Sequence, residues 1–96
     1  MPADVVIYTT GYCAYCYRAK VLLSKKNVRF TEIDVSDRSD LRTWLVETSG
    51  QRTVPQIFVN GQSIGGFDEL AGLERAGKLD AMLAAPPDAD APSLRH

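Results

Sequence analysis

The chain has 96 residues, of which 45% are hydrophobic and 24% charged, and its formal net charge is -1. This length suits one domain with its own core, and the balanced charge provides no basic surface typical of nucleic-acid binding. No apolar run approaches the roughly 18 to 20 residues of a membrane-spanning helix, which argues against membrane insertion. No basic and apolar leader precedes the first strand-like run, so we expect a cytoplasmic protein.

The first predicted strand, Val5 to Tyr8, is short, apolar and rich in β-branched residues. The only two cysteines, Cys13 and Cys16, follow at the start of a helical pattern. Two intervening residues place the cysteines about one helical turn apart, close enough to form a disulfide. If Cys13 also caps the helix, unpaired backbone N–H groups and the helix dipole favour its thiolate. Cys13 is therefore the predicted nucleophile.

Three other uses of the cysteine pair are less favoured. A structural zinc site needs about four ligands, but no third cysteine exists and the only histidine is His96 in a polar tail. A c-type haem site requires His directly after Cys16, where Tyr17 stands. A structural disulfide across so short a loop would constrain the unfolded chain little. Redox chemistry is the favoured interpretation, because a single cysteine pair in a reducing compartment suits a transient disulfide.

The first half of the chain predicts a strand, a helix, a strand and a second helix. Apolar positions at helical spacing predict the first helix over residues 14–26, with Asn27 as its left-handed cap. Alternation predicts a strand over residues 28–35, parallel to the first. A second helix should start near Ser39 or Asp40 and end at Ser49-Gly50, with Trp44 in the core.

The second half begins with an antiparallel hairpin. Residues 57–59 and 62–64 are predicted strands, and Asn60-Gly61 between them is a strong turn signal. Pro55 belongs at a strand entrance, where a cis peptide bond is possible. Gly65-Gly66 permits positive φ or close approach of another molecule.

Two short helices and a tail complete the chain. They are predicted over residues 67–76 and 78–83, with Asp68 near the start of the first. Residues 1–85 should form the domain, and residues 86–96 a polar, flexible tail rich in Pro, Asp and Ala.

Three separated motifs together resemble the dithiol glutaredoxins, in particular the bacterial glutaredoxin 3 type. They are Cys13-Ala14-Tyr15-Cys16, Thr53-Val54-Pro55 and Gly65-Gly66-Phe67-Asp68, and the likeness runs from about Asp4 to Leu83. The resemblance implies an α/β protein with a thioredoxin fold. It also implies a four-stranded mixed sheet in the order 2-1-3-4, flanked by helices, with Pro55 in the cis form.

The resemblance further implies a glutathione site. Tyr15 would flank the tripeptide, Val54 would pair with its cysteinyl backbone, and Gln51 would reach its glycine carboxylate. The start of the third helix would bind the γ-glutamyl carboxylate, and Asp68 its ammonium group. The implied binding residues are Tyr15, Gln51, Thr53, Val54, Pro55, Gly66, Phe67 and Asp68. Simpler roles stay open: Asp68 as a helix cap, Tyr15 as an exposed aromatic, and Gly65-Gly66 as a plain turn.

The implied activity is glutathione-dependent reduction of glutathione mixed disulfides and protein disulfides. Cys13 would attack, Cys16 would resolve, and glutathione would be the cosubstrate of a monomeric enzyme. Its partners would be glutathionylated or disulfide-containing proteins, with ribonucleotide reductase a possibility at the level of the family.

This chain departs from the family at two positions. Ala14 replaces a common proline, and Thr10 replaces a common lysine whose charge Arg18, Lys20 or Arg52 would have to supply. Without the proline, Cys13 of two chains and two glutathiones could hold a bridging [2Fe–2S] cluster, a carrier or sensor alternative. A non-enzymatic module that docks extended peptide near Pro55 is the third hypothesis.

Overall fold

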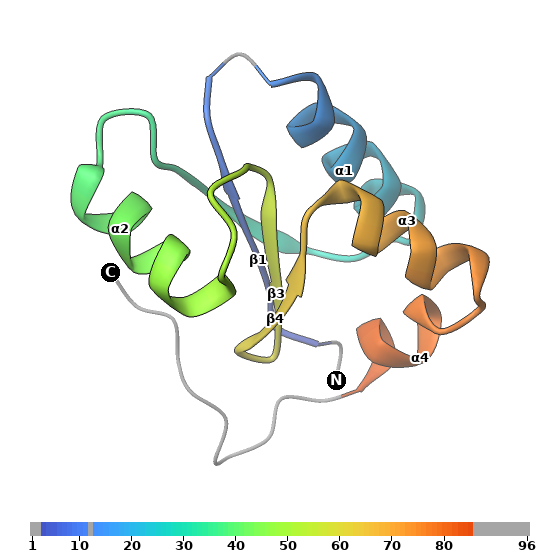
Figure 1. The fold of residues 1–96 in the computed structure, drawn as a ribbon. Coiled ribbons are helices and arrows are strands. Elements are labelled where there is room, and N and C mark those ends of the chain that lie inside the picture. Colours follow the sequence, from blue (N-terminus) through green and yellow to red (C-terminus); the bar gives the residue numbers. More distant parts are fainter. Residues whose placement is uncertain (1–2, 12, 86–96) are drawn as a thin grey trace.

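The computed structural model describes residues 3–11 and 13–85 (Figure 1). The predicted tail, residues 86–96, lies outside the described residues. Eight elements follow one another: β1 (Val5–Thr9), α1 (Ala14–Lys25), β2 (Phe30–Asp34), α2 (Ser39–Ser49), β3 (Gln56–Val59), β4 (Gln62–Gly65), α3 (Phe67–Arg75) and α4 (Leu79–Ala84). None of these helices has the length and apolar content needed to cross a bilayer.

The four strands form one mixed sheet in the order β2-β1-β3-β4, as predicted. β1 runs parallel to β2 and antiparallel to β3, and β3 pairs antiparallel with β4. The parallel pair requires a crossover, which α1 supplies. Asn60 and Gly61 both have positive φ, at 52° and 80°, as a tight hairpin turn requires.

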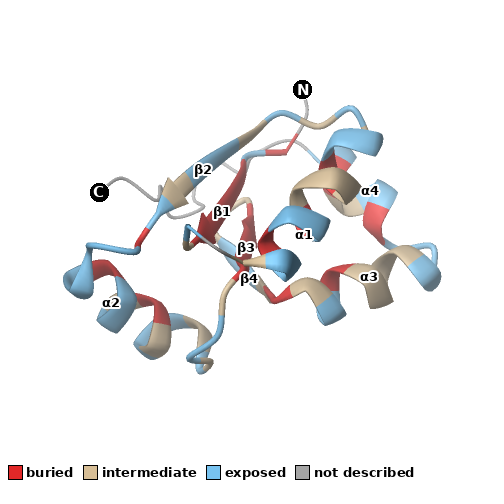
Figure 2. Ribbon diagram, turned by 90° about the horizontal axis from the view of Figure 1, so that it is seen from above, coloured by how far each residue is buried: buried red, intermediate tan, exposed pale blue. Residues whose placement is uncertain are grey.

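Helices cover both faces of the sheet (Figure 1), which explains why all five residues of β1 are buried. Val5 and Ile7 face α1, α3 and α4, whereas Val6 and Tyr8 face α2. Figure 2 shows the buried residues concentrated along β1 and β3 between these layers. The sheet thus holds the carboxyl end of β1 in a fixed position.

Two details differ from the sequence predictions. The second strand is shorter than residues 28–35, because Val28 and Val35 lie outside it. Trp44 is only partly buried: it packs at the edge of the core, with its ring 5.5 Å from that of Tyr8 and 5.6 Å from that of Phe58. The left-handed cap at Asn27 is confirmed, with φ of 57°.

Candidate active site

Cys13 is the N-cap residue of α1, as predicted. Its backbone is extended, with φ of -140° and ψ of 110°, and its sulfur accepts a hydrogen bond from the Cys16 N–H at 3.2 Å. The first turn of α1 carries no acidic residue that would oppose negative charge. The Cys13 sulfur thus lies at the positive end of the α1 dipole and accepts a backbone N–H donor, as the sulfurs of reactive cysteines often do.

Cys16 has the opposite surroundings, although it lies only one turn further along the helix. It is 2% exposed and faces the sheet. Burial, followed by the hydrogen bond with Cys13, raises the pKa of the Cys16 thiol to about 12. The backbone N–H of Thr10 and the charge of Lys20 act in the other direction but do not overcome burial. Cys16 is therefore held as a neutral thiol beneath the Cys13 sulfur.

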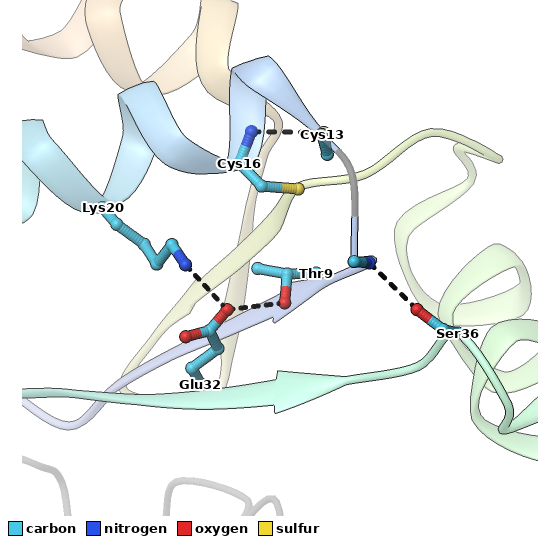
Figure 3. Close-up of polar contacts among 7 residues, drawn as sticks. Thr9, Cys13, Cys16, Lys20, Glu32 and Ser36 are labelled. Carbon is cyan, nitrogen blue, oxygen red and sulfur yellow. Dashed lines mark hydrogen bonds and ion pairs between the residues drawn. The ribbon is translucent and has the colours of Figure 1, made fainter.

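A polar group lies under α1 on the same side as Cys16 (Figure 3). The Glu32 carboxylate accepts hydrogen bonds from the Thr9 hydroxyl at 2.8 Å and from the Lys20 ammonium at 3.0 Å. These bonds, that of Lys20 first, lower the pKa of Glu32. Lys20 is thus held by its ion pair on the side of the helix from which its charge reaches Cys16.

The loop before β3 brings the second predicted motif, Thr53-Val54-Pro55, to the cysteines. The Val54–Pro55 peptide bond is cis, as the sequence resemblance implied. The Val54 carbonyl oxygen lies 3.7 Å from the Cys13 sulfur. Pro55 is buried and directly precedes β3. Residues separated by some forty positions therefore meet at the start of α1.

A cleft of about 320 Å³ adjoins this meeting point. It is lined by all eight residues of the predicted glutathione site and by one more, Glu69: Tyr15, Gln51, Thr53, Val54, Pro55, Gly66, Phe67, Asp68 and Glu69. The Tyr15 and Phe67 rings form one wall, with their centroids 6.2 Å apart. Such a mixture of aromatic walls and convergent polar groups is typical of a small-molecule site.

The glycines before α3 allow its start to approach the cleft. A Cβ atom on Gly66, the N-cap residue, would lie 3.3 Å from the Pro55 carbonyl oxygen. Gly65 has φ of 111°, and a Cβ there would come within 2.9 Å of the Glu69 side chain. Only glycine fits both requirements without displacement of a neighbour. Gly66 is the N-cap residue of α3, and Asp68 is the second residue of the helix, in its first turn.

Sequence reasoning missed Glu69 and Gln56, which form a hydrogen-bonded chain through Gln51. Gln56 is fully buried and donates to the Gln51 side-chain oxygen at 2.8 Å and to the Thr53 carbonyl at 2.9 Å. The Gln51 amide in turn donates to Glu69 at 2.9 Å. This bond and those from the backbone N–H groups of Glu69 and Gly66 lower the pKa of Glu69. A glutamine directly after Pro55 in an apolar strand was the signal available for Gln56.

The three candidate replacements for the missing lysine take different positions. Lys20 is paired with Glu32 and acts on Cys16. The Arg18 guanidinium lies 5.6 Å from the centroid of the Tyr15 ring, a cation–π distance. Arg52 is exposed and lines a separate hollow of about 40 Å³ beside Arg42. Within the described residues, none of the three forms a hydrogen bond with the Cys13 sulfur.

A capped cysteine with a buried partner one turn away, next to a cis-proline on a mixed sheet, can make and break disulfides by exchange. These features define a thiol–disulfide oxidoreductase of the thioredoxin fold. A glutaredoxin family profile matches residues 5–64. The chain belongs to the glutaredoxin family.

Known proteins of several organisms are similar over most of the chain. A glutaredoxin of Pseudomonas aeruginosa is 53% identical over 81 residues, which cover 84% of this chain and 96% of the relative. Glutaredoxin 3 of Escherichia coli K12 is 47% identical over 81 residues, covering 84% of this chain and 98% of the relative.

Solved structures agree with the fold. The crystal structure of a buckwheat glutaredoxin–glutathione complex matches with a TM-score of 0.79 and 37% identity, over 84% of this chain and 76% of that one. A structure described as "Metal Binding of Glutaredoxins" matches with a TM-score of 0.69 and 48% identity, over 88% of this chain and 91% of that one.

Proposed function

We propose that this oxidoreductase uses glutathione to reduce glutathione mixed disulfides and protein disulfides, with Cys13 as the attacking sulfur. The observation that carries the proposal is the single cleft that adjoins Cys13 through Val54 and gathers all eight expected binding residues. The structural relative crystallised with glutathione supports the same ligand.

In this proposal glutathione lies in the cleft with its sulfur toward Cys13. The Val54 backbone, exposed beside the cis bond, pairs with the cysteinyl residue of the ligand as a strand would. Backbone N–H groups at the start of α3 bind the γ-glutamyl carboxylate, and Asp68 binds the ammonium group. Glu69 now accepts hydrogen bonds at this helix start and from Gln51, so the ligand carboxylates compete with it for those donors.

Reduction of a glutathione mixed disulfide needs only Cys13. Its thiolate attacks the glutathione sulfur, the bond to the substrate sulfur breaks, and the substrate leaves as a thiolate that takes up a proton. Cys13 now carries glutathione in a disulfide. The thiolate of a second glutathione attacks the bound glutathione sulfur, which releases oxidised glutathione and restores the Cys13 thiolate.

Reduction of a protein disulfide uses both cysteines. Cys13 attacks one sulfur of the substrate, and a mixed disulfide forms while the other substrate sulfur leaves. Cys16 loses its proton and attacks the Cys13 sulfur, which releases the substrate and leaves a Cys13–Cys16 disulfide. Two glutathiones reduce that bond and become oxidised glutathione.

The environment of Cys16 orders these steps. In the reduced enzyme the Cys13 sulfur contributes twice to the raised pKa of Cys16, by accepting its hydrogen bond and by its charge. Once Cys13 is in a disulfide, that charge is gone, and the Cys16 thiol ionises more readily. Cys16 is thus protected before Cys13 reacts and becomes more reactive afterwards. A dithiol that cycles in this way requires a reducing compartment, in keeping with a cytoplasmic location.

A glutathione-coupled assay tests the proposal. The mixed disulfide of glutathione and 2-mercaptoethanol serves as substrate, and glutathione reductase with NADPH reports oxidised glutathione. We expect turnover that depends on glutathione and disappears in Cys13→Ser. Turnover supported by thioredoxin reductase but not by glutathione would overturn the proposal, and so would activity retained without Cys13.

Ala14 favours a second candidate, a glutathione-ligated [2Fe–2S] cluster bridging two chains. Among residues 3–11 and 13–85, no group of three or more His, Cys, Asp and Glu could hold a metal ion. Cys13 is partly exposed and can supply one thiolate, whereas Cys16 is buried within the chain. One chain therefore does not complete the set, but Cys13 of two chains and two glutathione thiolates supply four sulfur ligands, two for each iron. The relative described by its metal binding supports this candidate.

The matched variant for the cluster is Ala14→Pro. Ala14 is the first residue of α1, a position where proline is tolerated because its N–H has no partner within the helix. After anaerobic reconstitution with iron, sulfide and glutathione, we expect a coloured dimer from the wild type and a colourless monomer from the variant. A colourless monomer from both proteins would exclude the cluster.

A further inference from the structure

Helices α1 and α3 lie side by side on one face of the sheet (Figure 1). A second concave surface is lined by residues of both helices, and it includes Phe67 from the wall described above. Its volume is about 290 Å³. We call it the α1–α3 groove, and its lining residues are Arg18, Val21, Leu22 and Lys25 of α1 and Phe67, Ala71, Glu74 and Arg75 of α3. The mechanism above uses only Phe67 from this set.

The floor of the groove is apolar. Val21, Leu22, Phe67 and Ala71 are all only partly buried, and Leu22 and Phe67 also pack against the core. Their inner sides are therefore fixed by the fold, while their outer sides remain open to solvent. Such a rigid, half-buried apolar surface stabilises a complex when an apolar side chain of the partner covers the surface and excludes water from it.

The rim of the groove is basic. Arg18, Lys25 and Arg75 stand around it, against one acidic residue, Glu74. The Glu74 carboxylate is already paired with Lys26 at 2.6 Å. Lys25 and Arg75 are exposed, and neither has an ion-pair partner within 4 Å in the described part of the chain. The groove is thus locally positive, although the net charge of the chain is -1.

The groove adjoins the active-site cleft at Phe67. Phe67 lines both, and its other neighbour on the wall, Tyr15, lies under the Arg18 guanidinium. When the disulfide of a protein substrate lies at Cys13, the substrate residues beside that disulfide are therefore close enough to extend over Phe67 and into the groove.

We propose that the α1–α3 groove docks the protein substrate, and that it takes a segment with apolar side chains flanked by Asp or Glu. The apolar side chains fill the space between Leu22 and Ala71, and the carboxylates face Lys25 and Arg75. This inference rests on the proposed function and adds a substrate class to it: acidic, partly apolar sequences near the reacting cysteine.

Two synthetic peptides test the docking site. Each has about fourteen residues and one glutathionylated cysteine, since an extended chain spans about 3.3 to 3.6 Å per residue and so reaches beyond the cleft. One carries a Glu-Leu-Glu-Glu-Leu segment beside the cysteine, and the other has Lys in place of each Glu. We expect a kcat/KM about tenfold higher for the acidic peptide, a preference that shrinks at high salt.

The variant Lys25→Glu/Arg75→Glu should reverse this preference, lowering kcat/KM for the acidic peptide about tenfold. The matched control is Arg29→Glu/Lys78→Glu, which makes the same charge change at exposed positions outside the groove and should keep the wild-type preference. If the reversed charges destabilise the last turns of α1 and α3, Lys25→Gln/Arg75→Gln should still reduce the preference. Ala71→Gln, which places a polar chain on the floor, should weaken both peptides alike.

The small mixed disulfide of glutathione and 2-mercaptoethanol separates the two proposals. Its turnover should be unchanged in every groove variant, because it does not reach the groove. If the wild type fails on it, the proposed function is wrong. If the wild type reduces the small disulfide, but the groove variant and the control variant show the same preference between the two peptides, the docking proposal is wrong. Self-association of the wild type that the groove variant abolishes would also overturn it, because a second copy would then occupy the groove.

Discussion

The two cysteines are chemically identical and lie three positions apart, yet their surroundings differ in nearly every respect. Cys13 is partly exposed at the start of α1 and accepts a backbone hydrogen bond. Cys16 is buried against the sheet, with its pKa raised to about 12. Position along α1 causes the difference, because Cys13 is the N-cap at the open end of the helix, whereas Cys16 lies one turn further in and is buried. In the proposed mechanism, position within the fold, and not residue type, thus separates the attacking sulfur from the resolving one.

We expect the largest effect on turnover from removal of the exposed sulfur. Cys13→Ser should lower turnover of every disulfide substrate by a thousandfold or more, on the order of what loss of a catalytic nucleophile costs. Serine is itself a good N-cap, so the melting temperature should change little. The coupled assay and a thermal melt measure both quantities. Residual activity near that of the wild type would mean that Cys16 can attack first.

Removing the buried sulfur should have a narrower effect. We expect Cys16→Ser to reduce protein disulfides about a hundredfold more slowly but to leave glutathione mixed disulfides within about twofold, because only the first reaction needs a resolving thiol. Cys16→Ala is the matched variant, since it leaves no buried hydroxyl in need of a partner. Equal losses on both substrates in both variants would assign Cys16 a structural role instead.

The raised pKa of Cys16 predicts the pH dependence of ring closure. When Cys13 carries glutathione, closure needs the Cys16 thiolate, whose fraction grows about tenfold per pH unit below the pKa. Burial, the largest cause of the shift, persists in that state, so the rate should climb steadily through neutral pH. Acid quenching followed by mass spectrometry of the glutathionylated enzyme measures it. A rate that levels off below pH 7 would contradict a buried neutral thiol.

A variant of Asp68 tests whether the cleft beside Cys13 binds glutathione. Asp68→Asn should raise the KM for glutathione about fivefold to tenfold with little change in kcat, because an exposed charge-assisted bond to the ligand ammonium is lost. Asp40→Asn is a suitable control, since Asp40 is likewise the second residue of its helix. An equal KM in the two variants would reduce Asp68 to a helix-dipole residue.

Lys20 should have the smallest effect. Its charge is the last of the influences on Cys16 and lowers the pKa of that thiol. Lys20→Gln should therefore slow ring closure about twofold and leave the first attack by Cys13 unchanged. Lys78→Gln, an exposed change elsewhere, is the control. A slower first attack, measured by alkylation of Cys13, would show that Lys20 acts on Cys13 and contradict the predicted effect on Cys16.

Features that depend on local sequence were predictable. The N-cap role of Cys13, the left-handed Asn27 and the Asn60-Gly61 turn each follow from a few adjacent residues. The cis form of Pro55 was implied by the family resemblance and is present. The eight residues of the expected cleft also converge, because the motifs that carry them end at the same edge of the sheet.

Features that depend on how distant elements meet were not predictable. The Gln56–Gln51–Glu69 chain requires both the loop before β3 and the start of α3 to be in place. The partial exposure of Trp44 depends on how α2 packs against Tyr8 and Phe58 of the sheet. The α1–α3 groove likewise arises from the separation of two helices, which the spacing of apolar residues within either helix does not determine.

The burial of Cys16 also bears on survival under oxidative stress. Peroxides reach the exposed Cys13 first and convert its thiolate to a sulfenic acid, which further oxidant would carry irreversibly to the sulfinic and sulfonic acids. A thiol kept one helical turn away and shielded from the same oxidant can instead condense with the sulfenic acid, releasing water and forming a reducible disulfide. The sulfur that reacts least readily in the resting enzyme thereby limits the damage to the one that reacts most readily.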